Sequence, residues 1–118
     1  MTGVLVSGGR KYRDEPRIHS VLAAFHLKYP ITRLINGRAR GVDTICRNWA
    51  IANGIVAEDY PCTPAMWDEY GKAAGHIRNA QMFKLSKPDY AIVFPGGNGT
   101  AGMLEILHRA QMKVWEIT

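Results

Sequence analysis

Three segments of the chain place glycines next to basic side chains, a combination that suits the binding of an anion. They are Gly8-Gly9-Arg10-Lys11 with Arg13, then Gly37-Arg38-Ala39-Arg40-Gly41, and finally Gly71-Lys72 leading to Gly75 and Arg78. Glycine lets the backbone approach a ligand closely, and the basic side chains supply positive charge. One such cluster is typical of a solvated turn. Three of them, each in a loop after a predicted strand, favour a small phosphate-bearing ligand at least as much as a polymer.

A fourth segment, Pro95-Gly96-Gly97-Asn98-Gly99-Thr100, is a glycine-rich loop before a predicted helix. Its glycines would let unpaired amides at the helix start face an anion, and Thr100 would cap that helix or donate its hydroxyl to a phosphate. The loop lacks the lysine of a P-loop and the GxGxxG spacing, so nucleoside triphosphate hydrolysis and simple dinucleotide binding are poorly supported. A tight turn is the alternative, but a turn seldom needs three glycines in four residues.

Arg78 is the side chain best suited to hold a phosphate, because a guanidinium near a helix start can form two parallel hydrogen bonds. Met82, four residues later on the same helix face, would form an apolar wall. Asp43 would pair with Arg40, bind a ribose hydroxyl, or stabilise the start of its own helix. Three aromatic residues would either stack on a base or form small local cores; they are Tyr12, Trp67 and Tyr70.

The elements that must position these residues alternate between strands and helices. We predict strands over 2–7, 32–36, 55–60, 90–94 and 113–117, and helices over 15–29, 42–53, 76–85 and 101–111, with a loop over 61–75. This order predicts the α/β class: a single Rossmann-like domain over residues 1–118, with a five-stranded, mainly parallel sheet and helices on both faces. Ligands bind beyond the carboxyl ends of such strands. The loops after the first, second and fourth strands are those richest in glycine and arginine.

Helical spacing of apolar residues predicts which side chains face the core. The predicted inward sets are Ile18, Val21, Leu22 and Phe25; Val42, Ile45, Trp49 and Ala50; and Met103, Leu107 and Ala110. Gly54 is predicted to end the second helix in a left-handed conformation.

Composition excludes several classes of protein. The 118 residues include 47% apolar and 21% charged residues, which excludes disorder, collagen and coiled coil. No apolar run approaches the ~18 residues of a membrane span, and the first apolar stretch is too short for a signal peptide. Two cysteines and four histidines show neither a disulfide framework nor metal-ligand spacing. We expect a cytoplasmic protein with no metal, no cofactor and no membrane partner.

Four stretches, in this order along the chain, resemble the SLOG superfamily and its YspA-like branch. Residues 8–14 are similar to the opening "GxRxYxD" stretch, residues 36–43 to "GGARGAD" and residues 67–75 to "W…GkaAG". The fourth stretch that resembles the superfamily has two parts, residues 75–82 and residues 93–100. Asn36 stands where the branch usually has glycine, and His76 where it usually has proline. The resemblance implies a ligand related to nucleotides and a homo-oligomer. Superfamily members include LOG-type enzymes, which cleave the N-glycosidic bond of cytokinin nucleotides, and DprA-type proteins, which bind single-stranded DNA.

The LOG-type signature is matched only in part. Its "RKxxM" corresponds to Arg78-Asn79-x-x-Met82, and its "PGGxGTxxE" matches through Thr100, but Met103 stands in place of the glutamate. That glutamate is taken to assist cleavage through an oxocarbenium-like transition state, which methionine cannot do. Another carboxylate, from Asp14, Asp43 or Asp68, would have to replace it.

The leading hypothesis is therefore a protein that binds a nucleotide or NAD-derived phosphate-bearing molecule, as sensor or sequestering protein. The first alternative is an N-glycoside hydrolase of nucleoside monophosphates, with no catalytic residue assigned. The second alternative, suggested by the net charge of +5, is single-stranded DNA binding. The residues predicted to bind the ligand are Gly8, Gly9, Arg10, Gly37, Arg40, Asp43, Arg78, Asn79, Pro95, Gly96, Gly97, Gly99 and Thr100.

Overall fold

The chain folds around a five-stranded sheet, in a computed structural model that describes residues 2–118. The strands run in the order β3-β2-β1-β4-β5, and all four neighbouring pairs are parallel. Their bounds are β1 Gly3–Ser7, β2 Arg33–Asn36, β3 Val56–Asp59, β4 Tyr90–Val93 and β5 Val114–Glu116. The predicted α/β class and Rossmann-like parallel sheet are confirmed.

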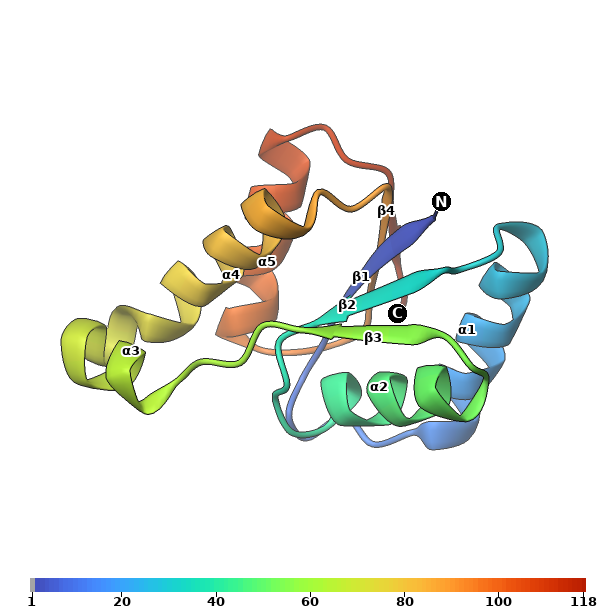
Figure 1. Cartoon of the computed structure of the whole chain (residues 1–118), viewed down its shortest axis with the longest axis horizontal. Helices are drawn as coiled ribbons and strands as arrows, with labels where there is room; N and C mark the ends of the chain where they lie inside the picture. Colours follow the sequence, from blue (N-terminus) through green and yellow to red (C-terminus); the bar gives the residue numbers. More distant parts are fainter. Residues whose placement is uncertain (1) are drawn as a thin grey trace.

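Helices cover both faces of this sheet (Figure 1). Helices α1 and α2 lie on one side, α4 and α5 lie on the other, and α3 projects beyond the sheet. Their bounds are α1 Glu15–Lys28, α2 Val42–Ala52, α3 Pro64–Tyr70, a short 3-10 turn η1 Gly71–Ala73, α4 Ala74–Ser86 and α5 Asn98–Arg109. No helix within residues 2–118 is long and apolar enough to cross a membrane.

Two hydrophobic cores fill the space between the sheet and its helices, and β1 contributes to both. Successive side chains of a strand point to opposite faces, so Val4 and Val6 enter the core under α1 and α2, while Leu5 enters the core under α4 and α5. Burial on both faces explains why β1 is an unbroken apolar run in the sequence. Most side chains predicted to face inward are buried, but Ala110 is exposed at the end of α5, contrary to prediction.

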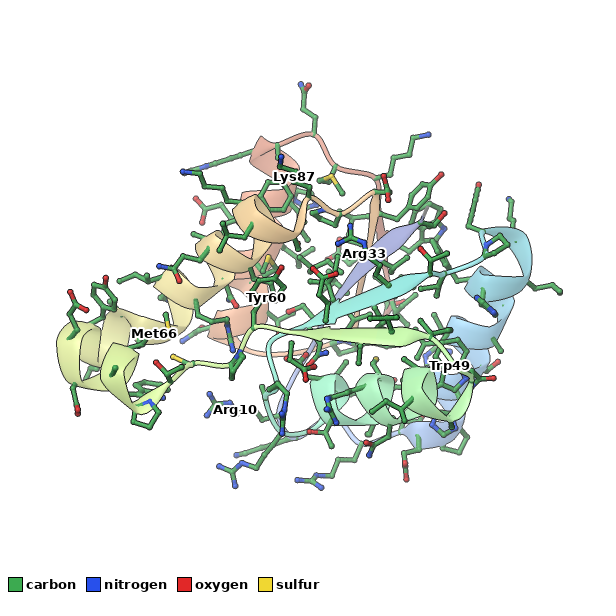
Figure 2. The ribbon with its side chains drawn as sticks, in the orientation of Figure 1. Arg10, Arg33, Trp49, Tyr60, Met66 and Lys87 are labelled. Carbon is green, nitrogen blue, oxygen red and sulfur yellow. The ribbon has the colours of Figure 1, made fainter. Side chains whose placement is uncertain are left out.

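One arginine of β2, Arg33, contacts both the neighbouring strand β3 and the end of α4. Arg33 forms an ion pair with Glu58 of β3 at 2.8 Å, and its other nitrogen donates to Ser86 O at 3.0 Å. Figure 2 shows Arg33 between β2 and the end of α4, where Lys87 begins the connection to β4. This contact sets the position of α4, which carries Arg78.

The segment 61–75, predicted as a loop, contains α3, η1 and the start of α4. None of the residues 64–70 is buried, so apolar periodicity gave no helix signal. The local signals were present: the Thr63 hydroxyl accepts a hydrogen bond from Met66 N at 3.2 Å, and Pro64 occupies the first helical position. Helix α5 also begins three residues earlier than predicted, so its N-cap is Gly97 and Thr100 lies inside the first turn. Thr100 therefore does not cap the helix.

Candidate functional site

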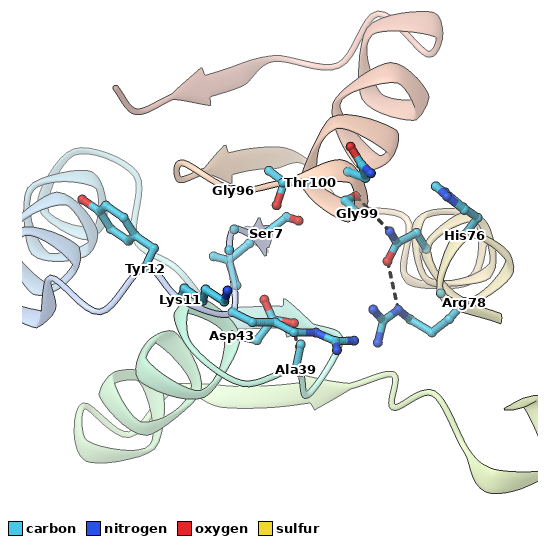
Figure 3. Close-up of a pocket in the computed structure, with 18 of the residues that line it drawn as sticks. Ser7, Lys11, Tyr12, Ala39, Asp43, His76, Arg78, Gly96, Gly99 and Thr100 are labelled. Atoms are coloured by element: carbon cyan, nitrogen blue, oxygen red, sulfur yellow. Dashed lines mark hydrogen bonds between the residues drawn. The ribbon is translucent and has the colours of Figure 1, made fainter. Parts of the chain in front are cut away.

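A cleft of about 800 Å³ opens beyond the carboxyl ends of β1 and β4 (Figure 3). The direction of chain progression through the sheet reverses between these two strands, which is where parallel α/β sheets bind ligands. This volume suits a small organic ligand. The cleft is lined by the loops after β1, β2 and β4, the start of α2, the α3–η1 segment and α4 as far as Met82.

The glycine-rich loop after β4 packs directly on the loop after β1. Gly9 donates its N–H to Pro95 O at 2.9 Å, and a Cβ on Gly96 would lie 2.7 Å from Gly9 N. Only glycine therefore fits at position 96. By contrast, a Cβ on Gly97 or Gly99 would meet open space. No side chain caps α5, so the amides of its first turn are available to an anion in the cleft.

A second glycine contact joins the loops after β1 and β2. Gly41 caps α2 at φ +79°, and a Cβ there would lie 2.6 Å from Arg10 O. Val42 N donates to Gly9 O at 3.3 Å. These contacts bring the start of α2, and with it Asp43, to the same rim as the glycine-rich loop.

Arg78 bonds to protein rather than pointing freely into the cleft. Its Nη1 donates to Gly37 O at 2.6 Å and, over a longer 3.5 Å, to Tyr60 O. Its Nε donates to Asn79 Oδ1 at 2.9 Å, and Asn79 Nδ2 donates to Gly99 O at 3.4 Å, as the dashed lines of Figure 3 show. Arg78 thus contacts the loops after β2 and β3 directly, and Asn79 links it to the first turn of α5. Nη2 is the guanidinium nitrogen that has no protein partner within residues 2–118, and the expected two-nitrogen contact with phosphate stays a prediction.

Asp43 is a buried carboxyl group that faces the cleft. Its Oδ2 accepts hydrogen bonds from Gly37 N at 3.0 Å and Ala39 N at 3.2 Å, so it orders the loop after β2. It forms no ion pair with Arg40 in the part of the chain that the structure describes. Burial raises the pKa of Asp43 to about 6, and the two amides, together with the charges of Arg78 and Arg10, oppose that rise.

Exposed cations complete the lining. Arg10, Lys11 and Lys72 line the cleft, and none of them forms an ion pair within residues 2–118. Arg38 instead lies 3.7 Å from Asp59, and Arg40 is exposed outside the lining. The basic residues that directly follow the glycines of the loop after β1 and of η1 therefore line the cleft, whereas those of the loop after β2 do not.

Comparison with known proteins agrees with this architecture. The model of the YAcAr family, described as the YspA, cpYpsA-related SLOG family, matches residues 2–70. The Gene 61 protein of Mycobacterium phage D29 is 31% identical over 116 residues, which cover 94% of this chain and 90% of that protein. The chain belongs to the YspA, cpYpsA-related SLOG family. Membership suggests a nucleotide-related ligand or a related function.

The structure of this SLOG protein brings most of the predicted site residues to one cleft. Gly37 accepts a hydrogen bond from Arg78 and Arg40 is exposed, and neither residue lines the cleft. The predicted residues that line it are Gly8, Gly9, Arg10, Asp43, Arg78, Asn79, Pro95, Gly96, Gly97, Gly99 and Thr100. The predicted list of ligand-binding residues omitted the other lining residues, which are Val6, Ser7, Lys11, Tyr12, Ala39, Trp67, Lys72, Gly75, His76, Met82 and Asn98. Ser7, Ala39 and Asn98 directly adjoin or interrupt a glycine cluster, so proximity to those clusters could have identified them.

The other candidate residues of this SLOG protein differ in whether they line the cleft. Of the three carboxylates considered, Asp14 caps α1 and Asp68 is exposed on α3, which leaves Asp43 as the one carboxylate lining the cleft among residues 2–118. Met103 is fully buried in the core under α4 and α5. His76 lines the cleft and packs on Gly102 of α5. Residues 2–118 contain no group of three or more potential metal ligands of the His, Cys, Asp or Glu type.

Proposed function

We propose that this SLOG protein binds a nucleotide or NAD-derived, phosphate-bearing small molecule in the cleft, as a sensor or sequestering protein. The observation that supports this most is the uncapped first turn of α5 beside Arg10, Lys11 and Lys72 in one cleft. Amides at a helix start and nearby cations both favour an anion, and the two act together here.

Asp43 adds a second kind of contact to the proposed site. Its Oδ2 already accepts two amide hydrogen bonds, and its Oδ1 accepts none from residues 2–118. A carboxylate oxygen in a cationic cleft is suited to accept a hydrogen bond from a hydroxyl group. The phosphate of the ligand would lie on the α5 amides, with a ribose hydroxyl on Asp43.

Titration calorimetry with AMP, ADP-ribose and NAD tests this function, after native mass spectrometry has shown whether a molecule co-purifies. Arg10→Ala should weaken phosphate-ligand binding about tenfold or more, because a hydrogen bond to a charged group is lost. Arg13→Ala is the control: Arg13 follows the same strand and is exposed, but it does not line the cleft. Equal losses in the two variants, or no binding to the wild-type protein, would contradict the proposal.

N-glycoside hydrolysis is a second candidate, and the position of Asp43 is what favours it. A carboxylate near the glycosidic bond can stabilise an oxocarbenium-like transition state, the task that Met103 cannot perform. Chromatography of nucleoside monophosphates after incubation would detect free base. Release that disappears in Asp43→Asn, with ligand binding retained, would establish the enzyme. Binding without release would leave the sensor or sequestering function.

A further inference from the structure

The projecting arm formed by α3 and η1 carries a tryptophan, Trp67, that is not buried. Helix α3 packs against η1 and α4, and none of its residues is buried. Figure 2 shows Met66, the residue before Trp67, on this arm. Trp67 is 45% exposed, whereas Trp49 in α2 is buried. Because an indole ring stabilises a fold in proportion to the area it removes from water, Trp67 contributes less than a fully buried tryptophan would.

Local bonds nevertheless hold Trp67 in a defined place. Thr63 caps the start of α3, and Gly71, at φ +56°, donates its N–H to Trp67 O at the end of the helix. Trp67 lines the cleft, while Tyr70, one helical turn later and 37% exposed, does not. The arm therefore presents one of its two rings to the cleft. Lys72 of η1 lines the cleft as well, so the arm supplies a cation together with the indole.

The other rings in the lining already have packing partners. Tyr12 packs on Phe94, with 6.2 Å between the ring centroids, and Figure 3 shows it at the end of the cleft opposite His76. His76 packs on Gly102. Trp67 forms no aromatic pair within residues 2–118. Trp67 thus lines the cleft with indole surface that no other aromatic ring of residues 2–118 covers.

We propose that Trp67 stacks on the ring of the bound ligand, so that the cleft prefers a phosphate joined to an aromatic base over a sugar phosphate without one. This inference rests on the proposed function, since it assigns the specificity of the same cleft. Base–aromatic stacking tolerates different bases because every base has a π-face. Trp67 would therefore select for the presence of a base rather than for its identity.

The test compares ligands that differ in the ring. Calorimetry measures AMP, ADP-ribose and ribose 5-phosphate with wild-type protein, Trp67→Ala and Tyr70→Ala. The wild-type protein should bind AMP about tenfold more tightly than ribose 5-phosphate. Trp67→Ala should lose that difference and keep its affinity for ribose 5-phosphate. Tyr70→Ala is the matched control on the same helix and should keep the wild-type difference, and Trp67→Phe should restore part of what alanine loses.

The possible results distinguish a failure of the role assigned to Trp67 from a failure of the proposed binding function. An AMP advantage that persists in Trp67→Ala, or that is absent in the wild-type protein, overturns the assignment of Trp67 and leaves phosphate binding in place. A fall in ribose 5-phosphate affinity equal to the fall for AMP also overturns it, because Trp67 would then shape the cleft rather than contact a ring. Failure of all three ligands to bind the wild-type protein overturns the proposed function itself.

Discussion

Arg78 shows how one side chain can organise a site without offering most of its donors to a ligand. Its guanidinium bonds to Gly37 O and to Asn79, which in turn reaches Gly99 O. Gly37 lies in the loop after β2, Asn79 in α4 and Gly99 in the first turn of α5, so these hydrogen bonds tie three segments of the chain together. A planar fork of donors at fixed angles is what this arrangement needs, and lysine does not provide it.

Replacing Arg78 by lysine should therefore disturb the cleft although the charge is kept. We expect the free energy of unfolding to fall by about 2 kcal/mol, since hydrogen bonds from a charged donor are lost. Chemical denaturation measures this change. Arg40→Lys is the control, because Arg40 is exposed outside the cleft, and its effect should stay within about 0.5 kcal/mol. Equal stability of Arg78→Lys and wild-type protein would show that the hydrogen bonds do not matter.

Asp43 should make stability depend on pH in an unusual direction for a carboxyl group. Its pKa is raised from 3.8 to about 6 on folding, so between these values the folded state holds the proton more tightly than the unfolded state. The contribution of Asp43 to stability is then largest below pH 4 and declines as the pH rises through 6. The difference between these two pKa values corresponds to a loss of roughly 3 kcal/mol in the free energy of unfolding as the pH rises.

Asp43→Asn removes this titration. Relative to the wild-type protein, the variant should gain roughly 3 kcal/mol in free energy of unfolding between pH 4 and pH 7, as measured by denaturation at each pH. Asp68→Asn, on the exposed α3, should show no such gain. A stability difference between Asp43→Asn and wild type that stays constant with pH would mean that the pKa of Asp43 is close to its ordinary value.

At the scale of elements, the start of α5 shows two glycines with opposite roles. A Cβ on Gly96 would meet Thr100 and lie 2.7 Å from Gly9 N, whereas a Cβ on Gly99, inside α5, would meet nothing within 4 Å. Gly99 is also outside the left-handed region. Close approach of two loops therefore explains Gly96 but not Gly99.

Gly96→Ala should lower the free energy of unfolding by about 1–3 kcal/mol, because the backbone of two loops must move apart. Gly99→Ala should raise it by roughly 0.5–1 kcal/mol, because alanine restricts the unfolded chain and favours the helix. Thermal denaturation of the pair measures both effects. Changes of the same sign in the two variants would contradict the contact between the loops after β1 and β4.

The elements also show what the sequence could predict. Strand β1 and helices α1 and α2 were predictable because their apolar spacing reflects burial in the two cores. Helix α3 was not, since it buries no residue. In the site, Arg10 and the glycines adjacent to strand ends were predictable from parallel topology. The role of Arg78 was not, because its acceptor Gly37 lies 41 residues away and is a backbone carbonyl, which leaves no mark on residue type.

For the whole molecule, the net charge of +5 leaves a choice between a small ligand and a polymer. Arg10, Lys11 and Lys72, which form no ion pair within residues 2–118, line one cleft. We therefore expect a mononucleotide to displace an oligodeoxynucleotide from the protein, as followed by fluorescence anisotropy. Affinity that rises with strand length, falls steeply with salt and resists mononucleotide would instead indicate a single-stranded DNA binder. The homo-oligomer implied by the resemblance stays a prediction for light scattering.

The central position of β1 has a consequence for synthesis of the chain. Strand β1 pairs with β2 on one side and with β4 on the other, yet β4 begins at Tyr90. While the ribosome is still making the residues between them, one edge of β1 has no neighbour to accept its backbone hydrogen bonds. Such an edge can recruit strands from other molecules. The nascent protein is thus most vulnerable to aggregation just before the segment from Tyr90 onward emerges, when a chaperone would be of greatest use.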